Sequence, residues 1–111
     1  MKVEHQQVGT VDVLTPVGAL VDEDAESFCR VLMDRLQSAN PRVVLSMQEV
    51  PYLDSAALEG LLGAADELAE QAVDLKLVKV TPACRDIFVL TDLAGRFRFF
   101  DNVQDAVKSY L

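Results

Sequence analysis

The sequence predicts an α/β domain in which a mixed sheet of four or five strands is covered by about four helices. Short apolar runs alternate along the chain with longer segments whose apolar residues recur at helical spacing. The first two strand-like runs are adjacent, whereas each later one follows a helix, so we expect one antiparallel pair and then parallel crossovers. The 111 residues, 50% of them hydrophobic and 25% charged, suffice for one domain with its own core.

The predicted strands are bounded by glycine and proline, which mark turns. Gly9 and Thr10 are expected to form the turn of the opening pair, and Gly18 ends its second strand. The run that begins at Arg42 predicts a strand covered on both faces, because it is short, apolar and partly β-branched, and Pro51 blocks its continuation. The expected strands lie at residues 3–8, 11–17, 42–47, 74–80 and 96–100.

The predicted helices show amphipathic periodicity, and most begin at a recognisable start signal. The second helix opens near Ser55 and has the strongest periodic pattern in the chain. Thr81 and Pro82 predict the start of the third, a capping hydroxyl followed by proline at the first helical position. Asn102 is expected to cap the last helix. The expected helices run from residue 22 to about 39, from 55 to about 72, from 82 to about 93 and from 103 to about 110.

Charge and cysteine usage exclude several classes of function. The formal charge of −8 disfavours nucleic acid and anionic lipid as partners, and no run of Lys or Arg offsets it. The apolar runs are too short to span a bilayer, and the N-terminus lacks the order of a signal peptide, so we expect a cytoplasmic protein with no membrane insertion. Cys29, Cys84 and His5 have no neighbours at ligand spacing, so neither a metal nor another cofactor is expected.

The step from Asp54 to Ser55 is the main candidate site. It places a serine at or next to a helix N-terminus, where free backbone N–H groups and the helix dipole tolerate a phosphate. The alternative is that Ser55 is only an N-cap hydroxyl, and Asp54 only a cap or turn residue. No histidine lies near Ser55 in the sequence, no acidic residue is evident to orient His5, and there is no glycine-rich phosphate loop, so an enzyme is not expected.

Small residues on the second helix suggest a docking surface. Glycine inside a helix costs about 1 kcal/mol relative to alanine, so two of them on an outward face indicate the close approach of another backbone. The alternatives for both glycines are close packing inside the domain and tolerated drift. The predicted docking surface combines the turn Leu20, Val21 and Asp22 with Asp54, Ser55, Ala56, Gly60, Gly63 and Ala64.

With these elements assigned, the chain resembles the STAS domain, the fold of bacterial anti-sigma-factor antagonists, over essentially residues 1–111. The Asp54-Ser55 step between a strand and a helix is the most specific part of the resemblance. Supporting landmarks are Gly18-Ala19-Leu20, the strand Val43-Val44-Leu45, and Leu93, Phe97 and Phe100 before the last helix.

The resemblance implies a regulated binding module. The residue that matches Ser55 is phosphorylated by a partner that is both a kinase and an anti-sigma factor, the unphosphorylated form binds that partner, and a PP2C-type phosphatase resets the switch. The chain departs from the family pattern at Val21, Ser46 and Ala57, where aspartate, aspartate and glycine are common.

Two other functions remain open from the sequence. One is a constitutive STAS scaffold, for example the accessory subunit of a lipid-transport ABC ATPase, in which Ser55 is never modified. The other is a small enzyme that uses Cys84 or Ser55, because Cys84 lies in a first helical turn beside Arg85, a setting that can make a thiol reactive. Otherwise Cys84 is a core residue. An exposed edge strand would allow a monomer or a weak dimer.

Overall fold

The structure, a computed structural model, describes residues 1–111 as a single α/β domain. One mixed sheet contains all five strands in the order β1-β2-β3-β4-β5, and the element order is the predicted one with a short 3₁₀ helix, η1, added. The strands are β1 (Lys2–Val8), β2 (Val11–Val17), β3 (Val43–Ser46), β4 (Lys76–Val78) and β5 (Arg98–Phe100). The helices are α1 (Asp22–Arg35), α2 (Ser55–Ala69), α3 (Pro82–Leu90), η1 (Ala94–Arg96) and α4 (Val103–Lys108).

The opening hairpin is confirmed, including its turn. β1 and β2 pair antiparallel from Lys2 opposite Val17 to Val8 opposite Val11, and Gly9 takes a positive φ of 61° in the turn. All later neighbours pair in parallel, because each connection passes through a helix. The carboxyl ends of β3 and β4 therefore lie at one end of the sheet, and their starts lie at the other.

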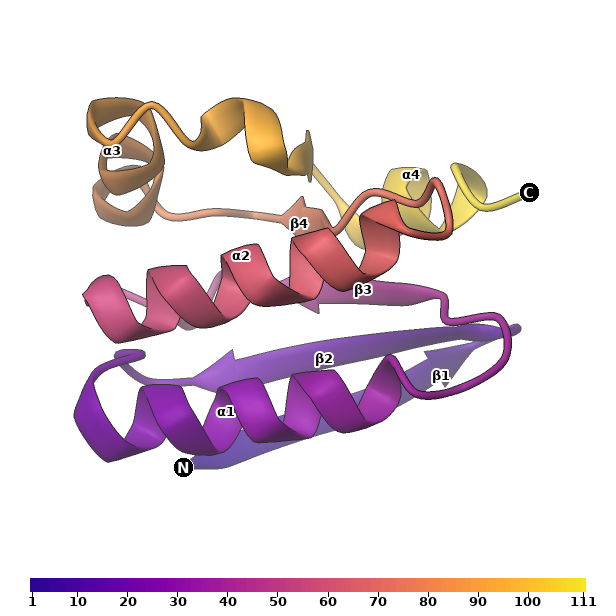
Figure 1. The fold of residues 1–111 in the computed structure, drawn as a ribbon, viewed down its shortest axis with the longest axis horizontal. Helices are drawn as coiled ribbons and strands as arrows, with labels where there is room; N and C mark the ends of the chain where they lie inside the picture. The colour runs from indigo at the N-terminus through magenta and orange to yellow at the C-terminus, as the bar shows by residue number, and fades with distance from the viewer.

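Helices cover both faces of the sheet. α1 and α2 run side by side across one face, with their N-termini at the same end, and α4 packs on the opposite face (Figure 1). The larger core joins α1, α2 and α3 to side chains such as Leu14, Leu45 and Leu77. The smaller core joins Ala106 of α4 to Val44 and Val78. None of the helices combines the length and the apolar character that crossing a bilayer requires.

The phenylalanines near the C-terminus divide between the two faces of the sheet. The ring centroids of Phe88 and Phe97 lie 5.1 Å apart, and those of Phe88 and Phe99 lie 5.7 Å apart, so these three rings close the larger core beside β5. Phe100 points to the other face, where it packs with α4. The sheet edge is thereby held from both sides.

The predicted ends of several elements were wrong. α1 stops at Arg35 rather than near residue 39, and α3 stops at Leu90, where Asp92 takes a positive φ of 59° and turns the chain. β4 is only three residues long and does not alternate between buried and exposed positions, since Lys76 is buried as deeply as its apolar neighbours. A strand covered on both faces need not alternate between apolar and polar residues.

Of the caps predicted for α3 and α4, only that of α4 is confirmed. The side chain of Asn102 accepts a hydrogen bond from the backbone N–H of Asp105 at 2.8 Å, so it caps α4. Thr81 precedes α3 as expected, but its hydroxyl does not cap the helix. It donates instead to the carbonyl oxygen of Val50 at 2.9 Å, which ties α3 to the segment after β3.

Candidate functional site

The segment between β3 and α2 is held in place by backbone hydrogen bonds to two other parts of the chain. The N–H of Leu20 donates to Tyr52 O at 2.9 Å, and the N–H of Asp54 donates to Leu20 O at 3.0 Å. On the other side, Thr81 and Cys84 both donate to Val50 O. The start of α2 is therefore fixed relative to the start of α1 and the start of α3.

The carboxylate of Asp54 caps α2 and also binds the start of α1. Its Oδ1 accepts from the N–H of Ala57 at 2.9 Å, and its Oδ2 accepts from the N–H of Asp22 at 2.8 Å. Asp22 adopts a left-handed backbone with φ of 50° at the first residue of α1. These two hydrogen bonds stabilise the ionised carboxylate and hold the pKa of Asp54 below its usual range.

Ser55 is the first residue of α2, and its side chain is exposed. It is not the N-cap, since Asp54 occupies that position, so the simple capping role considered for Ser55 is wrong. The N–H of Ala57 is bonded to Asp54 Oδ1 and that of Leu58 to Asp54 O, which leaves the N–H groups of Ser55 and Ala56 at the open end of the helix. A hydroxyl at this position is accessible to a modifying enzyme.

The predicted docking surface is only partly exposed. Ser55, Ala56, Gly63 and Asp22 are exposed, and Val21 and Asp54 are half-buried. The side chains of Leu20 and Ala64 are fully buried in the larger core, so their predicted place on an outward surface is wrong. Leu20 contributes to the region only through its backbone hydrogen bonds.

Gly60 faces α1 rather than solvent. A Cβ atom added at Gly60 would overlap Cys29 Sγ and would lie 3.0 Å from Cys29 Cβ. The glycine therefore permits close packing of the two helices inside the domain, one of the alternatives that the sequence left open, and the predicted outward position is wrong. A Cβ at Gly63 would meet no atom within 4 Å, so Gly63 remains a surface position.

A shallow groove of about 430 Å³ runs along α1 beside the start of α2. Because Ala56 lines it, the groove adjoins Ser55. The carboxylates in its wall outnumber the single guanidinium, that of Arg30, which agrees with the acidic charge of the whole chain. The lining residues are Asp22, Glu26, Cys29, Arg30, Met33, Asp34 and Ala56.

Both cysteines have properties of structural residues. Cys84 is fully buried and its thiol donates to Val50 O at 3.4 Å, which confirms the core role. Burial raises the pKa of the Cys84 thiol, and burial together with the charge of Asp54 raises that of Cys29. Raised pKa values reduce the thiolate fraction, so neither residue has the activation that a nucleophilic cysteine needs.

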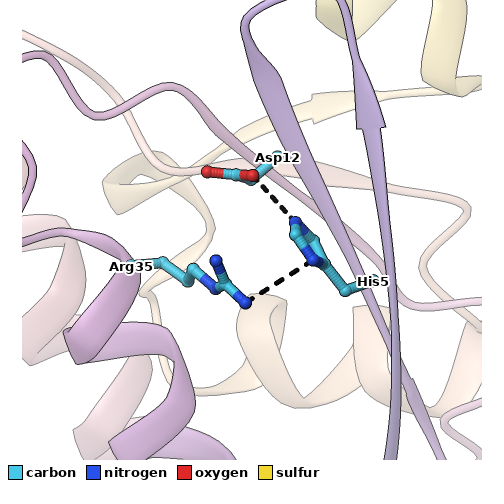
Figure 2. A network of polar contacts seen from close by, with 3 residues as sticks. All are labelled: His5, Asp12 and Arg35. Carbon is cyan, nitrogen blue, oxygen red and sulfur yellow. Dashed lines mark hydrogen bonds and ion pairs between the residues drawn. The ribbon is translucent and has the colours of Figure 1, made fainter.

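His5 has polar partners that the sequence did not reveal (Figure 2). Its Nε2 lies 2.8 Å from Asp12 Oδ1, and its Nδ1 lies 3.5 Å from Arg35 Nη2. The expectation that no acidic residue orients His5 was therefore wrong. In the neutral tautomer with the hydrogen on Nε2, Nδ1 accepts from the Arg35 guanidinium and Nε2 donates to Asp12. The network joins β1 and β2 to the end of α1, away from Ser55.

Sequence reasoning missed two residues of the site. Tyr52 is 52% exposed in the segment that leads to Asp54, and its carbonyl holds Leu20. Cys29 forms the wall against which Gly60 packs. An aromatic residue between two turn-forming positions was the available signal for Tyr52, whereas the pairing of Cys29 with Gly60 depends on how two helices cross. No group of three His, Cys, Asp or Glu side chains is arranged to hold a metal ion.

A family model for the STAS domain matches residues 2–106 of the chain. The chain belongs to the STAS domain family. A sequence search of curated proteins found no significant match. The predicted family and fold class are thus confirmed by the match and by the five-stranded mixed sheet with four α-helices.

Several STAS structures share the fold at low sequence identity. TM1081, a proposed anti-sigma factor antagonist from Thermotoga maritima, superposes with a TM-score of 0.88 at 20% identity, over 96% of this chain and 92% of that one. The phosphorylated form of the Bacillus cell fate determinant SpoIIAA gives 0.75 at 18% identity, over 99% and 100%. A serine-to-glutamate variant of RsbS from Moorella thermoacetica gives 0.73 at 16% identity, over 98% and 94%.

Proposed function

We propose that this STAS domain is an anti-sigma-factor antagonist that binds a kinase-type anti-sigma factor and is released when Ser55 is phosphorylated. A PP2C-type phosphatase restores the binding form. The proposal rests on the position of Ser55. This residue is exposed at the start of α2 and lies next to Asp54, which is the N-cap residue of the helix. The role is that of a bacterial cytoplasmic regulator and involves no catalysis by this chain.

The position of Ser55 is suited to reversible modification without unfolding. Its side chain is exposed, and the helix keeps its cap because Asp54 makes the hydrogen bonds to Ala57 and Asp22. A phosphate adds roughly −1.5 to −2 charge, which the open N–H groups and the dipole of α2 favour. The domain therefore survives phosphorylation while its surface changes.

The surface around Ser55 is suited to a partner that reads this change. Ala56 and Gly63 present no bulky side chain, so a partner backbone can approach α2 closely. A phosphate brought into such an interface beside the ionised Asp54 must lose its water, and without a matching cation the cost is several kcal/mol. About 3 kcal/mol corresponds to roughly a hundredfold loss of affinity, which is enough for a switch.

The proposal is tested by capturing partners from the protein's own cells with the wild-type chain, Ser55→Ala and Ser55→Asp. We expect the wild type and Ser55→Ala to retain a kinase-type anti-sigma factor, and Ser55→Asp to bind it at least about tenfold more weakly. Ser38→Asp is the matched control, because Ser38 is an exposed serine beyond the other end of α1. Equal binding by all variants would favour the unmodified STAS scaffold instead.

A further inference from the structure

The structure brings together three basic side chains that are far apart in the sequence. Arg42, Lys76 and Arg98 line one cavity of about 310 Å³, on a chain with only 10 Lys and Arg residues and a formal charge of −8. The cavity lies where β3, β4 and β5 begin, at the opposite end of the parallel strands from Ser55. The sequence contains no run of basic residues, because the cluster forms only on folding.

The register of the sheet places these basic side chains next to one another. Val44 pairs with Lys76, and Lys76 pairs with Arg98, so the side chains of Val44, Lys76 and Arg98 lie in a row on one face of the sheet. Arg42 is two residues before Val44 and lies on the same side of the chain. Like charges on directly neighbouring strands destabilise a sheet, so the pairing of Lys76 with Arg98 calls for a compensating anion.

Lys76 is the most constrained of the three. It is only 4% exposed, its Nζ donates to Ser109 Oγ at 2.7 Å, and Nζ lies 3.3 Å from the centre of the Tyr110 ring. No carboxylate forms a salt bridge with it. Burial, Arg98 and Arg42 lower the pKa of Lys76, and Asp74 opposes them only in part.

The charge of the cavity wall defines the ligand class. Three cations and one carboxylate, that of Asp74, give a net wall charge of +2 when Lys76 is protonated. The side-chain amide of Asn40 also lines the cavity and can donate to an anion, whereas the hydroxyls of Ser109 and Tyr110 already donate to Ala106 O and Val43 O. We propose that this cavity binds a small phosphate-bearing dianion between Lys76, Arg98 and Arg42.

The proposal is independent of phosphorylation at Ser55. The probe is inorganic phosphate, titrated into the full chain at constant ionic strength and followed by backbone amide NMR, with acetate as the monoanionic control. We expect saturable shifts at Asp74, Lys76 and Ser109 with phosphate and much weaker shifts with acetate. Shifts spread over the whole surface, or equal binding of acetate, would overturn the proposal.

Matched arginine variants show whether the site is this cavity. Arg98 and Arg85 each place a guanidinium over a phenylalanine ring, at 4.9 Å from Phe100 and 4.1 Å from Phe99, and both are exposed, but only Arg98 lines the cavity. We expect Arg98→Gln to weaken phosphate binding about tenfold or more and Arg85→Gln to leave it unchanged. Equal affinities of the two variants would contradict the assignment. Arg98→Gln carries the test because Lys76, being buried, can affect folding when replaced.

Discussion

Asp54 Oδ2 accepts a hydrogen bond at 2.8 Å from the backbone N–H of Asp22, a residue 32 positions earlier in the chain. The other oxygen of the same carboxylate caps α2 through Ala57. One side chain therefore fixes the relative position of the N-termini of α1 and α2. Ser55, the next residue, is presented at a site whose geometry does not depend on its own hydroxyl.

Removal of the Asp54 carboxylate should destabilise the domain in a pH-dependent way. The folded-state pKa of Asp54 is below the usual value of 3.8, so its contribution is complete above that pH and is lost as the pH falls through the folded-state pKa. Asp54→Ala should therefore lower the thermal midpoint at neutral pH, and the difference from wild type should shrink in acid. Glu59→Ala, which removes an exposed carboxylate of the same helix, serves as the control.

Thermal denaturation followed by circular dichroism across the acid range measures this difference. A difference in thermal midpoint between Asp54→Ala and wild type that stays constant down to the most acidic pH would contradict this account. It would show that the two hydrogen bonds do not stabilise the folded state through the charged carboxylate.

The two glycines of α2 should respond oppositely to alanine. Gly63→Ala should stabilise the domain by about 1 kcal/mol, because the added methyl meets no atom and alanine favours the helix. Gly60→Ala gains the same stabilisation from helix propensity. It also forces Cys29 and α1 to shift, which costs about 1 to 3 kcal/mol of stability. The difference between the variants in urea denaturation isolates the packing of α1 on α2. Equal stability changes would mean that the helices separate without cost.

A second variant tests whether Cys29 is the contact that limits the size of the residue at position 60. Cys29→Ala removes the Sγ atom that the added Cβ would overlap, so the double variant Gly60→Ala, Cys29→Ala should recover part of the lost stability. A double-mutant cycle of unfolding free energies measures the coupling. Purely additive effects would show that another contact limits the approach of the helices.

Native thiols should react slowly. Burial raises the pKa of both cysteines, so each should react with a disulfide reagent more slowly than free cysteine, and Cys84 more slowly than the half-exposed Cys29. Denaturant should bring both to the rate of free cysteine. A native rate at Cys84 well above that of free cysteine would restore the hypothesis of a thiol enzyme.

Replacement of Ser55 should leave stability almost unchanged. Its side chain is exposed and is not the cap, so Ser55→Ala and Ser55→Asp should unfold within about 1 kcal/mol of wild type. Urea denaturation provides the measurement, and Ser38→Asp is again the control. Unfolding of Ser55→Asp would show that the serine is structural.

Local patterns in the sequence predicted the element order and the start of α2 because these depend on residues close in the chain. The apolar runs indicated the strands, and the Asp54-Ser55 step indicated the cap and the exposed serine. Lys76 is buried in β4 although it is charged, because a strand covered on both faces need not alternate between buried and exposed residues.

What the sequence could not show depends on contacts between distant elements. The helical pattern of α2 assigned Gly60 to an outward face. This assignment was wrong because α2 is covered both by the sheet and by α1, and periodicity does not show the contact with α1. Asp12 reaches His5 only through the hairpin register, and Arg42 meets Lys76 and Arg98 only in the folded sheet.

The most direct test of the proposed switch is intact-mass and phosphopeptide analysis of the protein purified from its own cells, with and without stress. We predict a single phosphate on Ser55 whose occupancy changes with the condition. Consistent absence of phosphate from a peptide that covers Ser55, while the same preparation retains its partner, would contradict the switch and leave a constitutive STAS scaffold.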